Sequence, residues 1–294
     1  MRRPTMLTET ERTEIIAAAR RGAHDYYLSA LLAPKKAKDD LLVLAAFEGE
    51  LRRISETIGD PILAEIRLQW WRDAVSAMAD MRQSGHPVAD ALARLVTSRH
   101  VSAASLHKSI DARSAETGTE PIATEQDLDS YLDRTDGAAL ARAVAVASTH
   151  IAVPEPRPAL VQAAGRCVGL SRILLDLSWR RESGRPPVLP GTTARAITQS
   201  DVHCQGSDAT EDIARLEARC REYADRAGRL LREVRGSWAE LPRWHRAALG
   251  PVALVGPYLK GLQRVGCHAP HPGGVISPVS RVARLWWAVR FARL

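Results

Sequence analysis

Apolar residues recur at the spacing of an amphipathic helix along nearly the whole chain. No segment shows the strict alternation of apolar and polar residues that indicates a half-buried strand. This pattern therefore predicts an all-α fold. The expected helices cover residues 9–21, 37–58, 61–82, 86–98, 101–115, 124–148, 158–182, 208–236, 242–264 and 278–293.

Proline and glycine collect between these segments, as at Gly59–Pro61, and both residues disfavour a continuing helix. The longest irregular stretch, residues 183–207, is rich in Pro, Gly, Thr and Ser, and loops of this length are often functional. No internal repeat or low-complexity tract is present, so residues 1–294 are expected to form a single domain with its core at residues 20–265.

Composition narrows the class of protein and of partner. Hydrophobic residues make up 45% of the 294 residues and charged residues 26%, which excludes a disordered chain. The net charge of +7 favours an anionic partner such as a diphosphate or an acidic lipid. The arginines are scattered among the helices without a nucleic-acid recognition motif, so nucleic acid is not an expected partner.

The cysteines form no CxxC pair, which is typical of a protein in a reducing cytoplasm. The segment Cys267-His268-x-x-His271 lies among Pro and Gly and lacks a second pair of ligands. We therefore expect a surface loop there, because structural zinc needs four well-spaced ligands. The first residues lack the apolar stretch of a secretory signal. No apolar run reaches the length of about 18 residues that spans a membrane, so a cytoplasmic location is expected.

The C-terminal segment 278–293 carries two apolar stripes. Val282, Leu285, Trp286 and Val289 can face a helical bundle. A second stripe, formed by Trp287, Phe291 and Leu294, lies near Arg284, Arg290 and Arg293. Aromatic residues beside arginines suit a helix that lies on a membrane surface. In the alternative, this last helix is buried on two sides of the bundle and both stripes are core. The first alternative would make the protein peripheral at an inner membrane.

Four blocks of sequence go beyond general helix pattern. They are Tyr27–Pro34 with Leu44–Phe47, Glu65–Ala74, Gly165–Asp176 with Gly184–Arg185 and Val188–Pro190, and Leu241–Leu259. Together they resemble the squalene/phytoene synthase family. This resemblance implies an isoprenoid (terpenoid) synthase-like helical bundle around a central cavity. It also implies two DxxxD motifs on facing helices that hold Mg²⁺ against prenyl diphosphates, since residues four apart share one helix face.

Most of those aspartates are missing from this chain. Alignment of the family pattern on Phe47 puts Arg52 and Glu56 at the first aspartate pair, and the second pair falls at Asp176 and Arg180. Asp25 replaces the family's serine, and the basic loop that ends at Pro190 has one extra residue and no tyrosine. One aspartate of the expected four therefore remains, with one glutamate as a partial substitute.

The replacements form two charge ladders with four-residue spacing, Glu48–Arg52–Glu56 and Arg172–Asp176–Arg180. If the two helices face each other across a cleft, arginine and carboxylate can pair there without a metal. Arg52 would then reach Asp176, or Arg180 would reach Glu56 or Glu48. In the alternative, both ladders are exposed helix-surface pairs that add little stability.

Two further details, His24-Asp25 before the tyrosines and the Ile66–Trp71 block, are similar to a divergent subgroup of the family. That subgroup includes the mitochondrial assembly factor for respiratory NADH dehydrogenase (complex I) and its bacterial relatives. This resemblance implies a protein that binds a prenyl lipid or a protein partner without catalysis. The alternative is an active prenyltransferase that condenses two prenyl diphosphates.

The residues implied for the cleft or for diphosphate binding are Tyr27, Arg52, Glu56, Arg172, Asp176, Arg180 and Arg185. No cofactor is required by the non-catalytic hypothesis. Mg²⁺ would be needed only by an active enzyme, with Glu56 and Asp176 as its protein ligands. The candidate partners are a prenyl diphosphate or isoprenoid lipid, a membrane surface at the C-terminal helix, and a protein.

Overall fold

A computed structural model provides the coordinates of the protein. It describes residues 7–78, 84–98, 100–118, 122–185, 188–191, 207–266 and 276–294. The Cys267-His268-x-x-His271 segment and residues 192–206 of the long irregular stretch lie outside these ranges.

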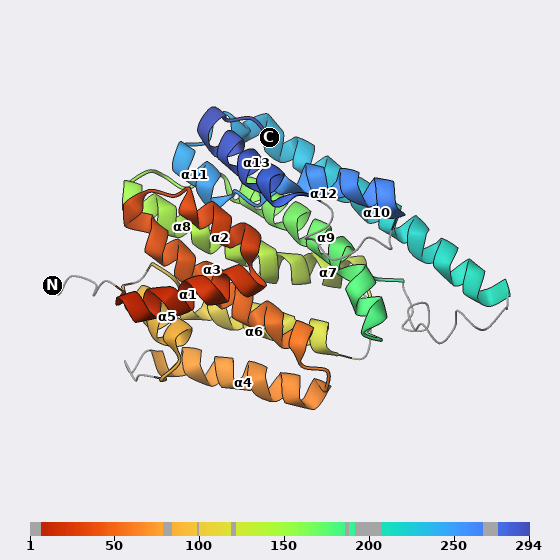
Figure 1. Ribbon diagram of the computed structural model, residues 1–294, viewed down its shortest axis with the longest axis horizontal. Helices are drawn as coiled ribbons and strands as arrows, with labels where there is room; N and C mark the ends of the chain where they lie inside the picture. The colour runs from red at the N-terminus through yellow and green to blue at the C-terminus, as the bar shows by residue number, and fades with distance from the viewer. Residues whose placement is uncertain are drawn as a thin grey trace.

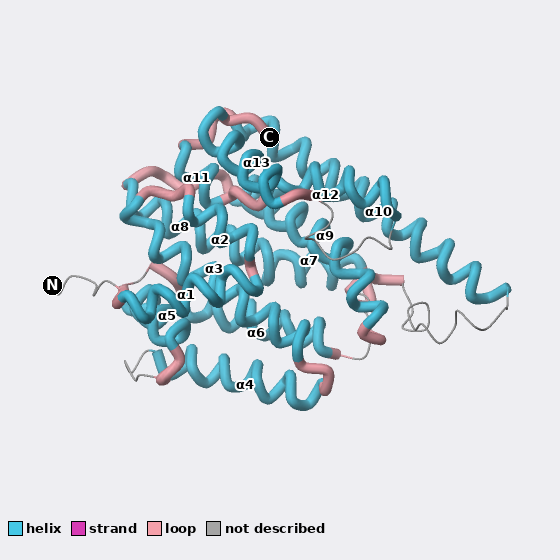
Figure 2. The backbone as a smooth tube through the Cα atoms, in the orientation of Figure 1, coloured by secondary structure: helices cyan, strands magenta, loops and turns pink. Residues whose placement is uncertain are grey.

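The described residues fold into helices with no strand among them, which confirms the predicted all-α class (Figures 1 and 2). The helices, in chain order, are α1 (Glu9–Gly22), α2 (His24–Leu31), α3 (Lys35–Thr57), α4 (Pro61–Ala77), α5 (Pro87–Thr97), α6 (Ala103–Thr117), α7 (Glu125–Leu132), the π-helical turn η2 (Asp133–Gly137), α8 (Ala138–Ile151), α9 (Pro158–Glu182), α10 (Ser207–Trp238), α11 (Arg243–Ala248), α12 (Val252–Val265) and α13 (Pro278–Phe291).

Two long helices organise the bundle. Helix α3 packs against α1, α2, α5, α6 and α8, whereas α9 packs against α10, α12, α8 and η2. Figure 1 shows α4 and α6 at one end of the molecule and α10, α12 and α13 at the other. The buried apolar side chains of these helices form one continuous core cluster. Helices α3 and α9 both line one cavity, as expected for the two ladder helices.

Some predicted boundaries are wrong for identifiable reasons. The segment 242–264 is two helices because the chain turns at Leu249–Pro251, where proline supplies no backbone N–H for the preceding helix. The predicted helix 124–148 contains the π-helical turn, and α2 is a separate helix that the sequence pattern did not reveal.

At the junction of α1 and α2, Gly22 meets α3 so closely that a Cβ would lie 2.3 Å from the Gly49 carbonyl oxygen.

Helix α13 buries a different face from the one expected. Its buried residues are Arg281, Leu285, Ala288 and Val289, so the prediction is correct for Leu285 and Val289. Val282 and Trp286 are 50% and 45% exposed, and their assignment to the bundle face was wrong. Arg281 takes a bundle-facing position because its Nε lies 3.4 Å from the Asp25 carboxylate of α2. No described helix is long and apolar enough to cross a membrane.

Candidate functional site

The acid at the centre of the candidate site comes from the π-helical turn η2. A π-turn is rare and often occurs where function requires an altered side-chain direction. Gly137 of this turn lies against Gly165 of α9, where an added Cβ would be 2.3 Å from the Gly137 Cα. This close backbone contact positions Asp136 beside α9, and Asp136 is completely buried.

Two arginines and a tyrosine surround the Asp136 carboxylate. Arg52 of α3 donates from Nη2 to Oδ1 at 2.7 Å, and Arg172 of α9 donates from Nε to Oδ2 at 3.0 Å. The Tyr26 hydroxyl also donates to Oδ1, at 3.0 Å. The Arg52 and Arg172 side chains are only 13% and 12% exposed. Asp136 is therefore an ionic bridge between the two ladder helices.

The charge state of Asp136 follows from these neighbours. Burial opposes its ionisation, but the positive charges of Arg172, Arg52 and Arg113 outweigh burial and lower its pKa to about 2. Burial also opposes the charged form of Arg172, yet Asp136 raises the pKa of Arg172 well above its usual value. Both groups are therefore charged at neutral pH.

A second layer of ion pairs lies around Glu48 and Glu116. Glu48 of α3 accepts from Arg113 at 3.1 Å and from Arg142 at 2.6 Å. Glu116 of α6 accepts from Arg113 at 2.6 Å and from the Tyr131 hydroxyl. Burial opposes ionisation of Glu116, but Arg113 and Arg172 lower its pKa. Glu116 is therefore ionised although it is buried, and the buried Glu48 lies between two guanidinium groups.

The surviving family aspartate has a weaker partner. Asp176 Oδ2 lies 3.5 Å from Arg172 Nη1. Burial raises the pKa of Asp176 although Arg172, Arg180 and Arg52 act in the opposite direction. Arg180 is buried and donates to the main-chain carbonyl of Glu116 at 3.3 Å. The contacts of the Asp176 carboxylate with Arg172 are therefore longer than those of Asp136.

We call the nine residues that these contacts connect the buried charge cluster. It consists of Glu48, Arg52, Arg113, Glu116, Asp136, Arg142, Arg172, Asp176 and Arg180. With one charge on each of its four carboxylates and five guanidinium groups, the cluster has a formal charge of +1. Pairing of this kind is the way in which buried charges are tolerated.

The ladder prediction is correct in its setting, and its pairing of Arg52 with Asp176 is wrong. Five of the six ladder residues are buried or half-buried and Glu56 is exposed at the end of α3, so the exposed-surface alternative is wrong for all but Glu56. Arg52, however, bonds to Asp136 where Asp176 was expected, and Glu48 bonds to Arg113 and Arg142.

A cavity of about 210 Å³ adjoins the buried charge cluster. Helices α3 and α9 line it with Arg52, Glu56, Val168, Ser171, Arg172, Leu175 and Asp176. The remaining wall residues come from α1, α2, the start of α12 and α13, and are Arg21, Gly22, His24, Asp25, Tyr26, Pro251, Tyr258 and Arg281. The cavity combines apolar wall with charges of both signs, so it suits a ligand with an apolar part and a charged end.

Two predicted site residues have other contacts. Arg185 donates to the carbonyls of Ser55 and Ile58, the latter at 2.5 Å, and so satisfies main-chain acceptors at the end of α3. Tyr27 lies beside His24 and Arg20, with ring and guanidinium centres 6.0 and 5.9 Å away. The tyrosine that reaches the buried charge cluster is its neighbour Tyr26.

The residues of the cleft do not fit a Mg²⁺ centre. Magnesium prefers carboxylate and water oxygens in octahedral geometry, whereas the permanently charged guanidinium of Arg52 lies in this cleft, bound to Asp136. Within the described part of the chain, neither Glu56 nor Asp176 belongs to a group of three potential metal ligands.

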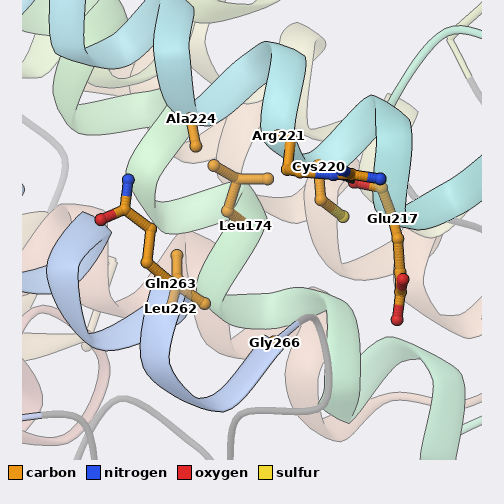
Figure 3. A pocket seen from close by; sticks show the side chains of 8 residues that line it. All are labelled: Leu174, Glu217, Cys220, Arg221, Ala224, Leu262, Gln263 and Gly266. Carbon is orange, nitrogen blue, oxygen red and sulfur yellow. Dashed lines mark hydrogen bonds between the residues drawn. The ribbon is translucent and has the colours of Figure 1, made fainter.

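A second cavity, of about 240 Å³, lies among α9, α10 and α12. Figure 3 shows side chains from all three helices around it. Its apolar wall includes Leu174, Cys220, Ala224 and Leu262. Leu174 and Leu175 are adjacent on α9, and Leu175 lines the first cavity, so α9 separates the two.

Sequence reasoning missed the acid at the centre of the site. Asp136 lies in the segment Asp133-Arg-Thr-Asp-Gly137, whose two aspartates and glycine directly precede the apolar segment 138–147 and interrupt the predicted helix. That interruption was the available signal. Arg113 and Glu116 were also missed, although their three-residue spacing places them on one helix face.

The helices α3 and α9 line a cavity with apolar and charged walls inside a helical bundle. This is the architecture of an isoprenoid synthase. The squalene/phytoene synthase profile matches residues 19–282, so the chain belongs to the squalene/phytoene synthase family. The expected family resemblance is thereby confirmed.

The structure is similar to two solved members of this fold. A dehydrosqualene synthase in complex with a ligand superposes with a TM-score of 0.71 at 16% identity, over 97% of this chain and 96% of that one. Squalene synthase HpnC from Alicyclobacillus acidocaldarius gives a TM-score of 0.66 at 16% identity, over 87% and 94% of the two chains. At these identities the similarity establishes the fold.

The curated relatives have a different description. "NADH dehydrogenase (ubiquinone) complex I, assembly factor 6" from Mus musculus is 22% identical over 272 residues, which cover 91% of this chain and 79% of the mouse protein. The Bos taurus protein of the same name is 26% identical over 121 residues, or 41% of this chain and 36% of the bovine protein. The similarity to the assembly-factor subgroup extends over most of the chain.

Proposed function

We propose that this protein is a non-catalytic member of the squalene/phytoene synthase family that acts in the assembly of respiratory NADH dehydrogenase. The observation that carries the proposal is the Arg52–Asp136–Arg172 bridge. An arginine replaces a family aspartate, and its guanidinium is bound to an acid from η2. The similarity to the mouse assembly factor over 91% of the chain supports the biological role.

The loss of catalysis follows from electrostatics. Departure of a diphosphate from a prenyl chain requires strong stabilisation of the developing negative charge, which a metal normally supplies. Arg52 and Arg172 offer positive charge, but both are bound to Asp136. Moving either one to a substrate would leave a fully buried carboxylate with one cation fewer. Because Arg52 and Arg172 are already paired with Asp136, they are poorly placed to stabilise a departing diphosphate.

A direct test measures diphosphate chemistry. Purified protein is incubated with farnesyl or geranylgeranyl diphosphate and Mg²⁺, and pyrophosphate release is followed against a no-protein control. The expected rate equals that of the control. Turnover that requires Mg²⁺ and disappears in Asp176→Asn would restore the prenyltransferase hypothesis and end this proposal.

The cavity between α3 and α9 is proposed to bind the charged end of an isoprenoid lipid. Arg52 and Arg172 lie on its wall, and Arg52 Nε is a buried donor with no hydrogen-bond partner. An anionic head group can accept from this Nε while Arg52 Nη2 keeps its bond to Asp136, so binding does not require either arginine to leave the bridge. The apolar chain would lie along Val168 and Leu175. Fluorescence titration with a non-hydrolysable farnesyl diphosphate analogue tests this, with geraniol-sized neutral alcohols as the comparison. Equal affinity for charged and neutral ligands would contradict the role of the arginines.

Helix α13 is proposed to contact an anionic membrane surface. Trp286, Trp287 and Phe291 are 44–46% exposed on it, and Arg284 and Arg290 are exposed beside them. This combination favours burial of the rings at the lipid head-group boundary with the arginines near lipid phosphates. Co-sedimentation with phosphatidylglycerol vesicles should fall at least severalfold in Trp287→Glu/Phe291→Glu. The control Ile62→Glu/Ile66→Glu removes exposed apolar residues from α4 instead. An equal loss in both variants would refute a specific role for α13.

The assembly role has its own test. In a strain that lacks the encoding gene, the amount of assembled NADH dehydrogenase on native gels should fall and recover with the wild-type chain. Recovery should also occur with Asp176→Asn, since no catalysis is involved. Failure of Asp176→Asn to restore assembly, with normal protein levels, would indicate that the cleft acts chemically.

A further inference from the structure

Two histidines and one aspartate meet at a place that the family site does not include. Asp40 lies near the start of α3, His100 follows α5, and His150 is in the last turn of α8. Their ligand atoms lie within 4.8 Å of one another. None of the three residues lines the cavity beside the buried charge cluster. They are the one group of three or more potential metal ligands within the described ranges.

The distances are close to those of a tetrahedral centre. Zn²⁺ binds His nitrogen and carboxylate oxygen at about 2.0–2.2 Å, so neighbouring ligand atoms lie about 3.3–3.5 Å apart. His100 Nδ1 is 3.5 Å from Asp40 Oδ2, which already matches. His150 Nε2 is 2.7 Å from the same oxygen, and opening this contact by about 0.6 Å would admit the ion.

His100 provides an independent indication. Its Nδ1 is buried and has no hydrogen-bond partner, although it lies 3.5 Å from the Asp40 carboxylate. A buried ring nitrogen normally has a partner. The rings of His100 and His150 are 5.2 Å apart and inclined at 69°, so they are not stacked on each other. A bound cation would satisfy the His100 nitrogen, which the Asp40–His150 hydrogen bond alone leaves unsatisfied.

We propose that Asp40, His100 and His150 form a binding site for a divalent transition metal of the zinc class. Two imidazoles and one carboxylate are a ligand set that such ions accept with a further position open. All three side chains keep 20–23% of their surface exposed, so water can fill the fourth position and the ion can enter from solvent. The site joins α3 and α8 to the segment after α5, and bound metal therefore stabilises the contact among these elements.

The test uses the full chain after removal of metal by a chelator. Zn²⁺ binding is measured by calorimetry and Co²⁺ binding by visible absorption, which reports tetrahedral coordination by nitrogen and oxygen. One metal per chain is expected at this site. At a metal concentration a hundredfold above Kd, the thermal midpoint should rise by about 5 °C.

Variants assign the metal to these residues. His100→Gln should weaken metal binding at least tenfold and abolish the Co²⁺ spectrum. It should lower the metal-free melting temperature less than His150→Gln, because His100 Nδ1 makes no hydrogen bond whereas His150 Nε2 bonds to Asp40. His150→Gln should lose the same spectrum. The control Cys267→Ser/His268→Gln/His271→Gln removes the other group of Cys and His residues in the sequence. This variant should keep the Co²⁺ spectrum.

Three results would overturn the proposal. The first is a metal-free protein that binds neither Zn²⁺ nor Co²⁺ at micromolar concentration. The second is binding that His100→Gln leaves intact. The third is binding that only the Cys267 control variant abolishes, which would assign the metal to that segment. If His150→Gln fails to fold, His100→Gln alone decides, since its hydrogen bonding in the metal-free protein does not change.

Discussion

Substitution of Arg52 by alanine removes one of two guanidinium groups that hold Asp136. The structure defines what is lost: the 2.7 Å ionic hydrogen bond to Oδ1 and the contact with the Tyr26 ring, whose centre lies 5.0 Å away. Removing one partner of an isolated buried pair costs about 3–5 kcal/mol, whereas a weakened buried polar group costs about 1–3 kcal/mol. Asp136 keeps Arg172 and Tyr26, so a loss of about 1–3 kcal/mol is expected.

Urea unfolding at neutral pH measures this loss, and the chain offers a matched control one residue away. Arg53 is on the same helix, but its side chain is 37% exposed and its ion pair with Glu50 spans 4.0 Å. Arg53→Ala should therefore change the free energy of unfolding by less than about 0.5 kcal/mol. The m-values of both variants should equal that of the wild type, because neither changes the extent of unfolding.

A double-mutant cycle isolates the pair. Asp136→Asn keeps the shape of the acceptor and removes its charge, so Arg52→Ala should cost less in that background. The difference between the two costs is expected to exceed about 1 kcal/mol. If Arg52→Ala unfolds at the same urea concentration as Arg53→Ala, and the cycle gives no coupling, the bridge contributes nothing. The interpretation of Arg52 as a substitute for metal would then be refuted.

Three further predictions concern other parts of the fold. The folded-state pKa of Asp136, about 2, lies below its ordinary 3.8, so its ionised form stabilises the fold above pH 3.8 and this contribution is lost as pH falls toward 2. Urea unfolding should accordingly show the stability difference between wild type and Asp136→Asn shrinking by about 2 kcal/mol over that interval, and a constant difference would contradict it. Gly165→Ala should lower the free energy of unfolding by more than about 2 kcal/mol and so lower the thermal midpoint, because its Cβ would meet the Gly137 backbone. Gly236→Ala, with open space around it, should be neutral or stabilising, and equal midpoints would argue against the close contact of α9 and η2. Asp25→Ala should speed hydrogen exchange in α13, since Asp25 accepts from Tyr258 at 2.7 Å and pairs with Arg281; unchanged exchange would mean that apolar packing alone holds α13.

Much of the fold could be predicted because helical periodicity is a local property. The predicted range 158–182 coincides with α9, and 37–58 differs from α3 by no more than two residues at either end. The all-α class followed from the same periodicity, whereas the family was predicted from the resemblance carried by the four sequence blocks. Boundaries failed where a local signal was overridden, as at Leu249–Pro251, or where a wider turn was inserted, as at η2.

The candidate site could be predicted only in part. The four-residue ladders correctly placed Arg52 and Asp176 at one cavity, since spacing determines which side chains share a helix face. Spacing does not determine which acid on another helix meets which arginine. The bond from Arg52 to Asp136 depends on how η2 lies against α9, and the roles of Arg113 and Glu116 depend on how α6 lies beside α3.

The sequence by itself thus determined that this chain is a helical bundle of the squalene/phytoene synthase family, and it predicted that most of the metal-binding aspartates are replaced. Only the tertiary structure decided what takes their place. Asp136 joins Arg52 and Arg172, and Asp40 meets His100 and His150, across separations of up to 110 residues. The physical reason is that helix periodicity acts over a few residues, whereas ionic and ligand contacts depend on the packing of whole helices.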